Sequence, residues 1–390
     1  MARLSDICLK IGSGATPTGG KSAYLMKGIS LIRSQNVLDI SFAEDGLAYI
    51  SDEQARKLQN VEILEGDILL NITGDSVARV CIVPNHILPA RVNQHVAIIR
   101  VDKTKADNNY ILYSLIKSKK TLLALASAGS TRNALTKKMI EEFEVFLPSL
   151  AEQKRIASIL SSLDDKIAVN RRICANLEAQ AQALFKSWFV DFTPFKDQPF
   201  VDSELGPIPQ GWKVGTLFDV ANLHDRYRRP LSSNQRSLMA KKYPYYGATS
   251  LMDFVEDYIF DGEYVLMGED GSVVTEKGYP FIQYVWGKIW VNNHAHVLSG
   301  KDGFPTELLI PFLKTYNIKG LVTGAVQAKL NQANMAQIQI PIPPKENINN
   351  ISVIIKSIYK KYRLLTEENQ RLAALRDTLL PKLMSGEIKL

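Results

Sequence analysis

Cysteine is scarce in this sequence, and the cysteines that it has lie far apart. There are 3 in 390 residues, at Cys8, Cys81 and Cys174. So few, in an odd number and without paired spacing, form neither a disulfide framework nor a zinc site. The chain also lacks a signal-peptide pattern and any run of about 18 apolar residues that could span a membrane. We therefore expect a protein of the reducing cytoplasm with no membrane contact.

The sequence also has no large excess of positive or negative charge. Lysine and arginine total 47 against 40 aspartate and glutamate, and the formal net charge is +7. Hydrophobic residues make up 46% of the chain and charged residues 22%, a balance typical of folded globular proteins. The length suits about two domains. A positive charge this small allows nucleic-acid binding without requiring it.

An internal repeat divides the sequence into two copies. The matched segments are 4–7 with 217–220, 92–95 with 291–294, and 129–136 with 324–331. The separation between matched residues shrinks along the chain, so the second copy is shorter in its first half. Matches are mostly apolar or glycine, whereas the polar residues between them differ. This pattern predicts one scaffold that carries two different surfaces.

Each copy changes its pattern once. Its first part alternates short apolar runs with Gly, Asn and Asp turns, which predicts a β-rich globular unit with some helices. From Ile156, and again from Ile351, residues of a heptad seam follow at alternating spacings of four and three. We expect an α+β protein in which two long helices pack as an antiparallel coiled coil. The predicted seam residues are Ile156, Leu160, Leu163, Ile167, Leu177, Leu184 and Trp188 in the first helix, and Ile358, Leu365, Asn369, Leu372 and Leu379 in the second.

The helix boundaries carry capping signals. Ser149 and Glu152 form a capping box, so the first helix should begin near Leu150. The second helix should end near Pro381, with Gly386 beyond it. These signals divide the chain into a first domain at 1–148, a helix at 149–192, a linker at 193–212, a second domain at 213–343 and a helix at 344–390.

Three polar residues lie on the predicted seam. Asn170 and Asn369 would fix the register of the helices at some cost in stability. Arg376 occupies the position that corresponds to Ala181 in the first copy, and we expect the arginine to use the room that the alanine leaves.

Four segments together resemble the specificity subunit of type I restriction-modification enzymes. They are LPSLAEQKRIASILSSLDDKI and AQALFKSWFVDF at the two ends of the first helix, SELGPIPQGW in the linker, and LAALRDTLLPKLMSGEI near the C-terminus. The resemblance covers nearly the whole chain, including its two-copy layout. One departure is PPKENINNISVI, where the family tends to repeat the PxxEQxxI pattern of the first copy.

The resemblance implies two β-rich target-recognition domains, related by a pseudo-two-fold repeat and separated by two long antiparallel helices. Each domain would read one half of a split sequence of double-stranded DNA, and two dissimilar domains imply an asymmetric target. Two methyltransferase (modification) subunits would dock on this body, with restriction or translocase subunits as further partners. The chain itself would catalyse nothing and hold no cofactor, since AdoMet, ATP and Mg belong to the partner subunits. A helix of roughly 40 residues is about 60 Å long, which corresponds to about 17 base pairs.

Side chains able to pair with base edges or phosphates gather in several loops of the first copy. The predicted DNA contacts there are Arg33, Gln35, Asn36, Asn71, Thr73, Arg91, Asn93, Gln94, Thr131, Arg132 and Lys137. The alternative for each is ordinary solvated polarity. The glycine-rich segment at 12–21 is either a loop that contacts the DNA backbone or a plain turn.

The most basic segment of the second copy is HDRYRRP at 224–230, where arginine beside tyrosine suits backbone contact or insertion into a groove. The predicted DNA contacts of this copy are Arg226, Arg228, Arg229, Lys241, Tyr246, Asn292, Asn293, Gln327 and Lys329. His95 and His294 occupy matched places in the two copies, which favours a structural role for both.

Three phenylalanines end the first helix away from its seam. Phe185, Phe189 and Phe192 would either close the helix end against the following domain or dock the methyltransferase, and we expect them to share both roles.

Catalytic motifs are missing. An amino-methylating DNA enzyme needs an Asn/Asp-Pro-Pro-aromatic motif, whereas the one Pro-Pro pair stands in IPPK. Asp164-Asp165-Lys166 has the D-x-K spacing of some metal nucleases, but it lies on the heptad helix, so we expect a solvated helix face and no metal. Two alternatives to the DNA-specificity interpretation remain. One is a DNA-modifying enzyme without a recognisable motif, and the other is a coiled-coil adaptor or scaffold whose globular ends bind proteins.

Overall fold

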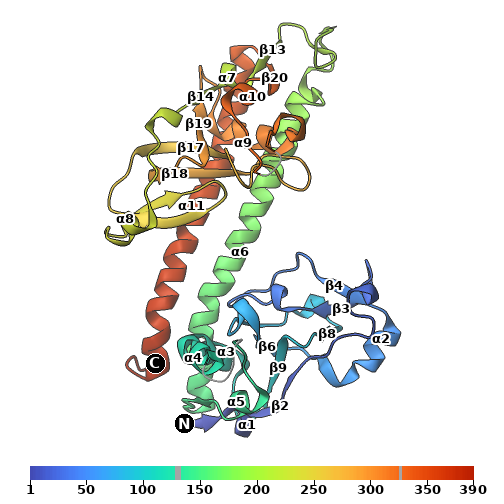
Figure 1. Ribbon diagram of the computed structural model, residues 1–390, viewed down its shortest axis with the longest axis vertical. Helices are drawn as coiled ribbons and strands as arrows, with labels where there is room; N and C mark the ends of the chain where they lie inside the picture. The colour runs from blue at the N-terminus through green and yellow to red at the C-terminus, as the bar shows by residue number, and fades with distance from the viewer. Residues whose placement is uncertain (128–132, 325–326) are drawn as a thin grey trace. The chain divides into compact units, whose positions relative to one another are not determined.

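The computed structural model describes residues 1–127, 133–324 and 327–390. The chain forms two compact units. Unit 1 comprises Met1–Val169 and Glu368–Leu390, and unit 2 comprises Asn170–Glu367. The division falls inside two long helices, α6 (Leu150–Phe189) and α11 (Lys345–Ser385), so each unit contains part of both (Figure 1). Among the described residues, no helix is long and apolar enough to cross a membrane.

Unit 1 is built on an antiparallel sheet that is covered on both faces. Its strand order is β2 (Cys8–Ser13), β9 (Val96–Val101), β6 (Ile68–Asn71) and β7 (Val80–Ile82). Successive residues of a strand point to opposite faces, so Ile68 and Leu70 enter one core while Leu69 enters another. Both cores are apolar, which explains why these strands read as continuous hydrophobic runs.

A second sheet and a set of helices complete unit 1. The second sheet has the order β4 (Ala48–Ile50), β3 (Ile29–Ile32), β8 (Ala90–Val92) and β5 (Glu62–Ile63), with β3 and β8 parallel. The short strands β1 (Ala2–Arg3) and β10 (Glu144–Val145) pair with each other. The helices are α1 (Leu4–Ile7), α2 (Asp52–Lys57), α3 (Asn108–Lys117), α4 (Lys119–Ser127) and α5 (Lys137–Glu141).

Unit 2 has a six-stranded sheet in the order β14 (Ala221–Leu223), β19 (Ala295–Gly300), β17 (Phe260–Gly268), β18 (Ile282–Val291), β15 (Tyr243–Tyr246) and β16 (Leu251–Val255). One face packs on α9 (Thr306–Thr315) and on the helix parts of this unit, and the other face forms a smaller core. The remaining elements are β11 (Phe200–Val201), β12 (Ile208–Pro209), β13 (Lys213–Thr216), β20 (Gln339–Ile342), α7 (Leu217–Val220), α8 (Ser233–Ser237) and α10 (Gln332–Met335).

The internal repeat is present in the backbone hydrogen bonds. The N–H of Leu4 donates to the Phe143 carbonyl at 3.0 Å, and the N–H of Leu217 donates to the Ile338 carbonyl at 2.8 Å. The parallel pair β3 and β8 has its counterpart in β15 and β18. In unit 2 the long strand β18 pairs with both β17 and β15. Unit 1 uses two strands for the corresponding pairings, β7 with β6 and β8 with β3. One strand in place of two is part of the reason why the second copy is shorter.

The long helices pair antiparallel within each unit. In unit 1, Ile156 and Leu160 of α6 share a core with Leu380 and Leu383 near the end of α11. In unit 2, the later part of α6 shares a core with the beginning of α11. Ile156, Leu160, Ile167 and Leu365 are buried, and the other predicted seam residues, Leu163, Leu177, Leu184, Trp188, Ile358, Asn369, Leu372 and Leu379, are half-buried.

The predicted start of the first helix is correct, and the predicted end of the second is wrong. Helix α6 begins at Leu150, and the Ser149 hydroxyl accepts the Glu152 N–H at 3.3 Å. Helix α11 continues through Pro381 to Ser385. A proline within a helix removes the hydrogen bond to the carbonyl four residues earlier, here that of Asp377. Asp377 is exposed, so water can satisfy the carbonyl.

The expectation for Arg376 is also wrong. Its guanidinium does not enter the space beside Ala181, which lies in the core of unit 2. It belongs to unit 1, where it donates to Asp164 Oδ1 at 2.6 Å. The Tyr113 hydroxyl donates to Asp164 Oδ2, also at 2.6 Å. Burial, together with the Asp164 carboxylate, raises the pKa of Tyr113 above its ordinary value.

We expect Arg376→Ala to destabilise unit 1 by about 2 kcal/mol, because it leaves a largely buried carboxylate without its cation. The side chains of Arg376 and Asp164 are only 16% and 13% exposed. Urea unfolding followed by hydrogen exchange of unit 1 peptides measures the change. Arg371→Ala, on an exposed position of the same helix, is the control and should change stability by less than about 0.5 kcal/mol. Equal effects of the two substitutions would refute the role of the Arg376–Asp164 pair.

Candidate nucleic-acid interface

A tight turn between β8 and β9 organises the exposed polar residues of unit 1. Asn93, at its start, is only 7% exposed. Its backbone N–H donates to the Ile32 carbonyl at 3.0 Å, and its side-chain oxygen accepts the His95 N–H at 3.1 Å. Asn93 therefore holds the turn from inside. The next residue, Gln94, is exposed.

The glycine-rich segment at 12–21 begins at the end of β2, and the loop that follows packs directly on this turn. A Cβ atom added at Gly14 would lie 2.1 Å from the Val92 carbonyl oxygen and 2.2 Å from that of Asn93. Glycine is therefore required at position 14 for the loop to approach so closely. The approach brings the Thr16 hydroxyl within 2.6 Å of Gln94 Oε1.

Hydrogen bonds continue from Gln94 across the surface of unit 1. Gln94 Nε2 lies 3.0 Å from His95 Nε2, and His95 Nδ1 lies 2.7 Å from the Thr73 hydroxyl. Thr73 follows strand β6, and its backbone bridges Ala134. Three separate chain segments thus converge on one turn, and the exposed Gln94 is held from both ends of its amide.

Unit 2 repeats the turn between β18 and β19 with other side chains. Asn292 is 3% exposed, and its side-chain oxygen accepts the His294 N–H at 2.8 Å. The exposed residue that follows is Asn293. His294 Nδ1 contacts Asp270 Oδ1 at 2.7 Å, so an aspartate stands where unit 1 has Thr73. The backbone is shared, and the exposed groups differ.

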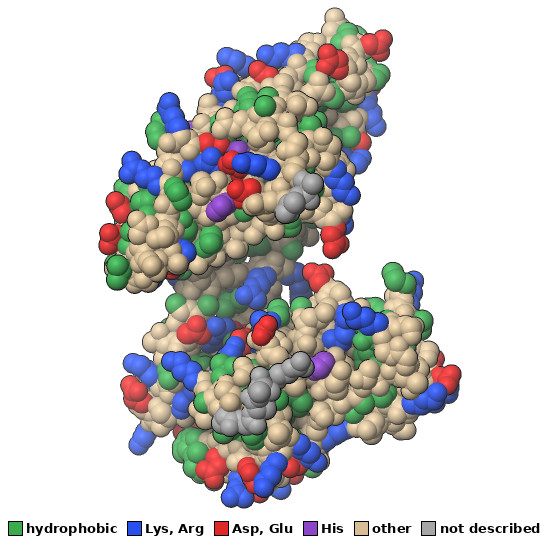
Figure 2. Space-filling model, in the orientation of Figure 1, with side chains coloured by type: hydrophobic (Ala, Val, Ile, Leu, Met, Phe, Trp, Pro, Cys, Tyr) green, Lys and Arg blue, Asp and Glu red, His purple; other side chains and the backbone are tan. Residues whose placement is uncertain are grey.

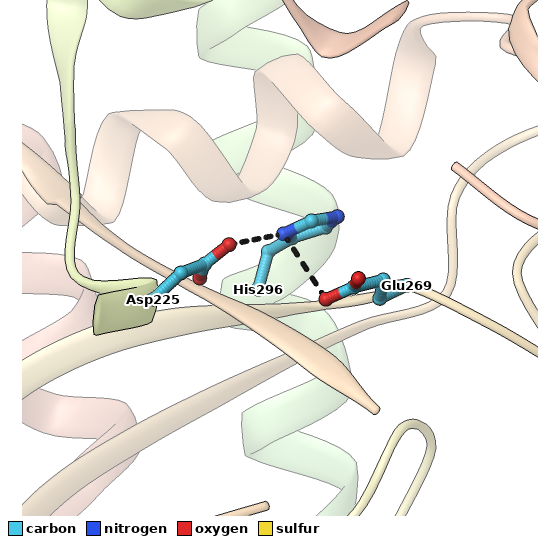
Figure 3. A group of neighbouring side chains, drawn as sticks. All are labelled: Asp225, Glu269 and His296. Atoms are coloured by element: carbon cyan, nitrogen blue, oxygen red, sulfur yellow. Dashed lines mark hydrogen bonds and ion pairs between the residues drawn. The ribbon is translucent and has the colours of Figure 1, made fainter. Parts of the chain in front are cut away.

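A cluster of charged side chains lies behind this turn in unit 2. Asp225, Glu269 and His296 point toward one another, as Figure 3 shows. Glu269 and His296 stand where unit 1 has Ile72 and Ala97, by the same backbone hydrogen bonds and strand pairings. Figure 2 shows histidine, acidic and basic side chains together on one face of unit 2.

The cluster is a closed network of ion pairs. Arg228 lies 2.6 Å from Glu269 and 3.2 Å from Asp225, and its own side chain is 11% exposed. Three groups with metal-ligand atoms meet here, but the guanidinium already supplies the positive charge that a metal ion would bring. The arrangement therefore favours a structural network over a metal site.

Both ring nitrogens of His296 face acceptors. Nδ1 lies 2.6 Å from Asp225 Oδ2, and Nε2 lies 2.8 Å from the Leu330 carbonyl oxygen. Burial disfavours the charged form of Asp225. Hydrogen bonds from His296 and from the Val297 N–H, together with the charges of His296 and Arg228, outweigh burial and hold the pKa of Asp225 below its ordinary value.

Several residues that were predicted to contact DNA are buried or half-buried and have structural roles instead. The Asn36 and Asn71 side chains are fully buried and donate to backbone carbonyls, and Arg91 is tied to Glu62 and to the Ala55 carbonyl. Asn93, Asn292 and Arg228 are internal, as described above. Arg33 is half-buried, donates to the Gly46 carbonyl and lies over the Tyr24 ring. These side chains make their contacts within the fold, although Asn71 Oδ1 and Arg33 Nε are buried with no hydrogen-bond partner among the described residues.

The remaining predicted contacts are accessible and stay predictions. Thr73 and Tyr246 are half-buried, and the exposed residues are Gln35, Gln94, Lys137, Arg226, Arg229, Lys241, Asn293, Gln327 and Lys329. Thr131 and Arg132 lie outside the described residues. Thr16 and Asp270 were not predicted, because nothing in the neighbouring sequence shows that they reach the turns. The repeat favoured a structural role for His95 and His294, and both rings are hydrogen-bonded.

The aromatic residues at the end of α6 close the core of unit 2. Phe185 and Phe189 are 3% and 2% exposed and stack at 4.7 Å. Phe189 also meets Trp212 at 5.6 Å, and Phe192 meets the same ring at 5.4 Å. The predicted closing role is confirmed. The docking role is wrong for Phe185 and Phe189, because residues of the following domain already cover them.

Comparisons with known proteins give one consistent result. A family model described as "Type I restriction modification DNA specificity domain" matches residues 2–179 and 209–374. A putative type I restriction enzyme specificity subunit of Haemophilus influenzae is 39% identical over 148 residues, covering 38% of this chain and 37% of that protein. A type I restriction enzyme specificity subunit of Methanocaldococcus jannaschii is 26% identical, covering 97% of this chain and 91% of that protein.

A solved structure has the same fold. The crystal structure of a type I restriction-modification system S subunit from M. genitalium superimposes with a TM-score of 0.59 at 16% sequence identity, covering 98% of this chain and 95% of that one. A chain of two β-rich units that share two long helices is therefore a known fold.

The charged cluster makes the stability of unit 2 depend on pH. Because the pKa of Asp225 is lowered by folding, its contribution is present above the ordinary value of about 3.9 and is lost as pH falls through the lower folded value. We expect Asp225→Asn to destabilise unit 2 by about 3 kcal/mol at pH 7, and the difference from wild type to shrink below about pH 4. Hydrogen exchange of unit 2 peptides across pH checks this.

Asp302→Asn, at an exposed position of unit 2, is the matched control and should leave exchange unchanged. If Asp225→Asn lowered stability equally at pH 3 and pH 7, the proposed ion-pair origin would be wrong.

Proposed function

The chain belongs to the type I restriction-modification DNA specificity family, and we propose that its two units read the two halves of one split, asymmetric DNA sequence. A specificity subunit selects the sequence and is not itself an enzyme. Family membership disfavours both alternatives that the sequence left open, the protein-binding adaptor and the DNA-modifying enzyme.

The observation that carries this proposal is the pair of matched turns. Asn93 and Asn292 hold the same backbone in the two units, while the groups displayed on it are Gln94 and Thr73 in one and Asn293 and Asp270 in the other. An unchanged scaffold with exchanged hydrogen-bonding groups is what reading two different half-sites requires.

Basic residues around these turns would position the duplex through its phosphates. In unit 2, Arg226 and Arg229 are exposed, and Arg226 lies 4.6 Å from the centre of the exposed Tyr227 ring. In unit 1, Lys137 is exposed at the start of α5. Such contacts add affinity without adding sequence information.

The helix pair offers a surface for the methyltransferase subunits. Large apolar residues are exposed on both helices, namely Val169 and Ile173 on α6, and Val353, Ile354, Leu364 and Leu375 on α11. Val169 and Leu364 occupy matched positions in the two helices, which suits two copies of the partner. Bound there, the partners would meet adenines of both half-sites and flip them out of the duplex for methylation.

Small molecules would enter through the partners. AdoMet would come with the methyltransferase subunits, and ATP and Mg with restriction or translocase subunits where a system has them. The assembled complex would act in the cytoplasm.

Coexpression of the chain with its partner methyltransferase, followed by genome-wide mapping of methylated adenines, tests the proposed function. We expect the two proteins to purify together and to methylate a split motif whose halves differ. The methyltransferase expressed alone should leave no such motif. Methylation spread over unrelated sequences, or none at all in the purified complex, would reject the proposal.

We expect Arg226→Ala combined with Arg229→Ala to weaken binding of the isolated chain to all duplexes alike. Each lost phosphate contact should reduce the slope of log affinity against log salt by about 0.9, so the pair should reduce it by about 1.8. A salt titration measures the slope. Arg171→Ala with Arg172→Ala removes the same charge from an exposed part of α6 and should leave the slope unchanged. A loss confined to one sequence would assign the arginines to base recognition instead.

A further inference from the structure

Gln94 is an exposed amide on the turn of unit 1, and the fold holds both of its amide atoms. The Thr16 hydroxyl lies 2.6 Å from Oε1, and His95 Nε2 lies 3.0 Å from Nε2. A free glutamine side chain would lose rotamer entropy on binding DNA. Here the fold has already restricted it, so less of that cost falls on recognition.

The hydrogen bonds leave a defined pair of groups for a ligand. An amide oxygen has two lone pairs and an amide nitrogen has two N–H groups. Thr16 uses one position on the oxygen, and His95 uses one on the nitrogen. Whether each of these bonds is donated or accepted by Gln94, its amide keeps one acceptor position and one donor position for a ligand.

Resting on the proposed function, we propose that Gln94 reads an adenine in the half-site of unit 1, through the major groove and in a base that stays stacked in the duplex. Adenine presents an acceptor at N7 and a donor at N6 on its major-groove edge. Guanine presents two acceptors, cytosine a donor and thymine an acceptor, so one donor beside one acceptor matches adenine alone.

The surroundings of Gln94 keep this edge in place. Asn93 holds the turn from inside, and Gly14 lets the loop that carries Thr16 come into contact with it. Thr16 and His95 are positioning residues in this scheme. Gln94 itself makes the contact to the base. The exposed polar residue at the matched place in unit 2 is the shorter Asn293, for which the described part of the structure records no side-chain hydrogen bond.

The experiment compares motifs methylated by complexes that contain Gln94→Ala, Gln94→Glu or wild-type chain. Gln94→Glu keeps the size of the side chain but removes its N–H donor. We expect both variants to lose the preference for adenine at one position in one half of the motif, by roughly 5- to 150-fold. The other half and the other positions should be unchanged. Gln59→Ala, at an exposed glutamine of the same unit, should leave the whole motif as in wild type.

Thr16 variants separate positioning from general folding effects. Thr16→Val keeps the shape and removes the hydroxyl, so it should reduce the same adenine preference partially, and Thr16→Ser should retain it. Thermal unfolding of each variant checks that the chain is folded.

Each outcome has a distinct meaning. A motif unchanged in Gln94→Ala, or altered at a G·C position, would overturn the adenine assignment while the specificity function stands. A wild-type complex that methylates no defined motif would overturn the proposed function itself.

Discussion

One hydrogen bond in each unit underlies the surface that the protein presents. The side-chain oxygen of a buried asparagine, Asn93 or Asn292, accepts the backbone N–H two residues ahead and so shapes the turn that follows a central strand. The turn no longer depends on the residue between, because that residue contributes nothing to the hydrogen bond. Gln94 in one unit and Asn293 in the other occupy this place, where the turn itself requires no particular side chain. A scaffold that holds its turn from inside can exchange what it displays outside without losing its fold.

The sequence predicted the helices correctly but assigned several buried asparagines to DNA contact. The asparagine hydrogen bond explains the second result. The seam from Ile156 onward and the cap at Ser149 are local patterns with one structural meaning, and the helix begins where they predict. An asparagine in a loop, in contrast, is compatible with two different roles. It can read a base edge or cap a turn with equal chemistry, so Asn36, Asn71, Asn93 and Asn292 looked like base readers until burial assigned them to the fold.

The other incorrect or missing predictions concern side chains whose contacts are distant in the sequence. Phe185 and Phe189 lie off the helix seam, so the sequence did not indicate their partners. Those partners include Phe312 of the following domain and Trp212 at the end of the linker. Arg376 found Asp164, a residue on the opposite helix that no spacing rule connects to it. Thr16 meets Gln94 only because Gly14 permits a backbone approach that no Cβ would allow. In each case the decisive neighbour is distant in the sequence.

The two units differ in how firmly the displayed surface is tied to the core. In unit 1 the links run between side chains at the surface, from Thr16 to Gln94 and from His95 to Thr73, above the apolar residues Ile72 and Ala97. In unit 2, Arg228 donates to the backbone carbonyls of Asn293 and Ala295 while it neutralises buried carboxylates. The turn of unit 2 is therefore coupled to a charge network, and changes to that network alter surface and stability together. Unit 1 keeps the two separate, which makes its displayed residues the freer of the two sets to diverge.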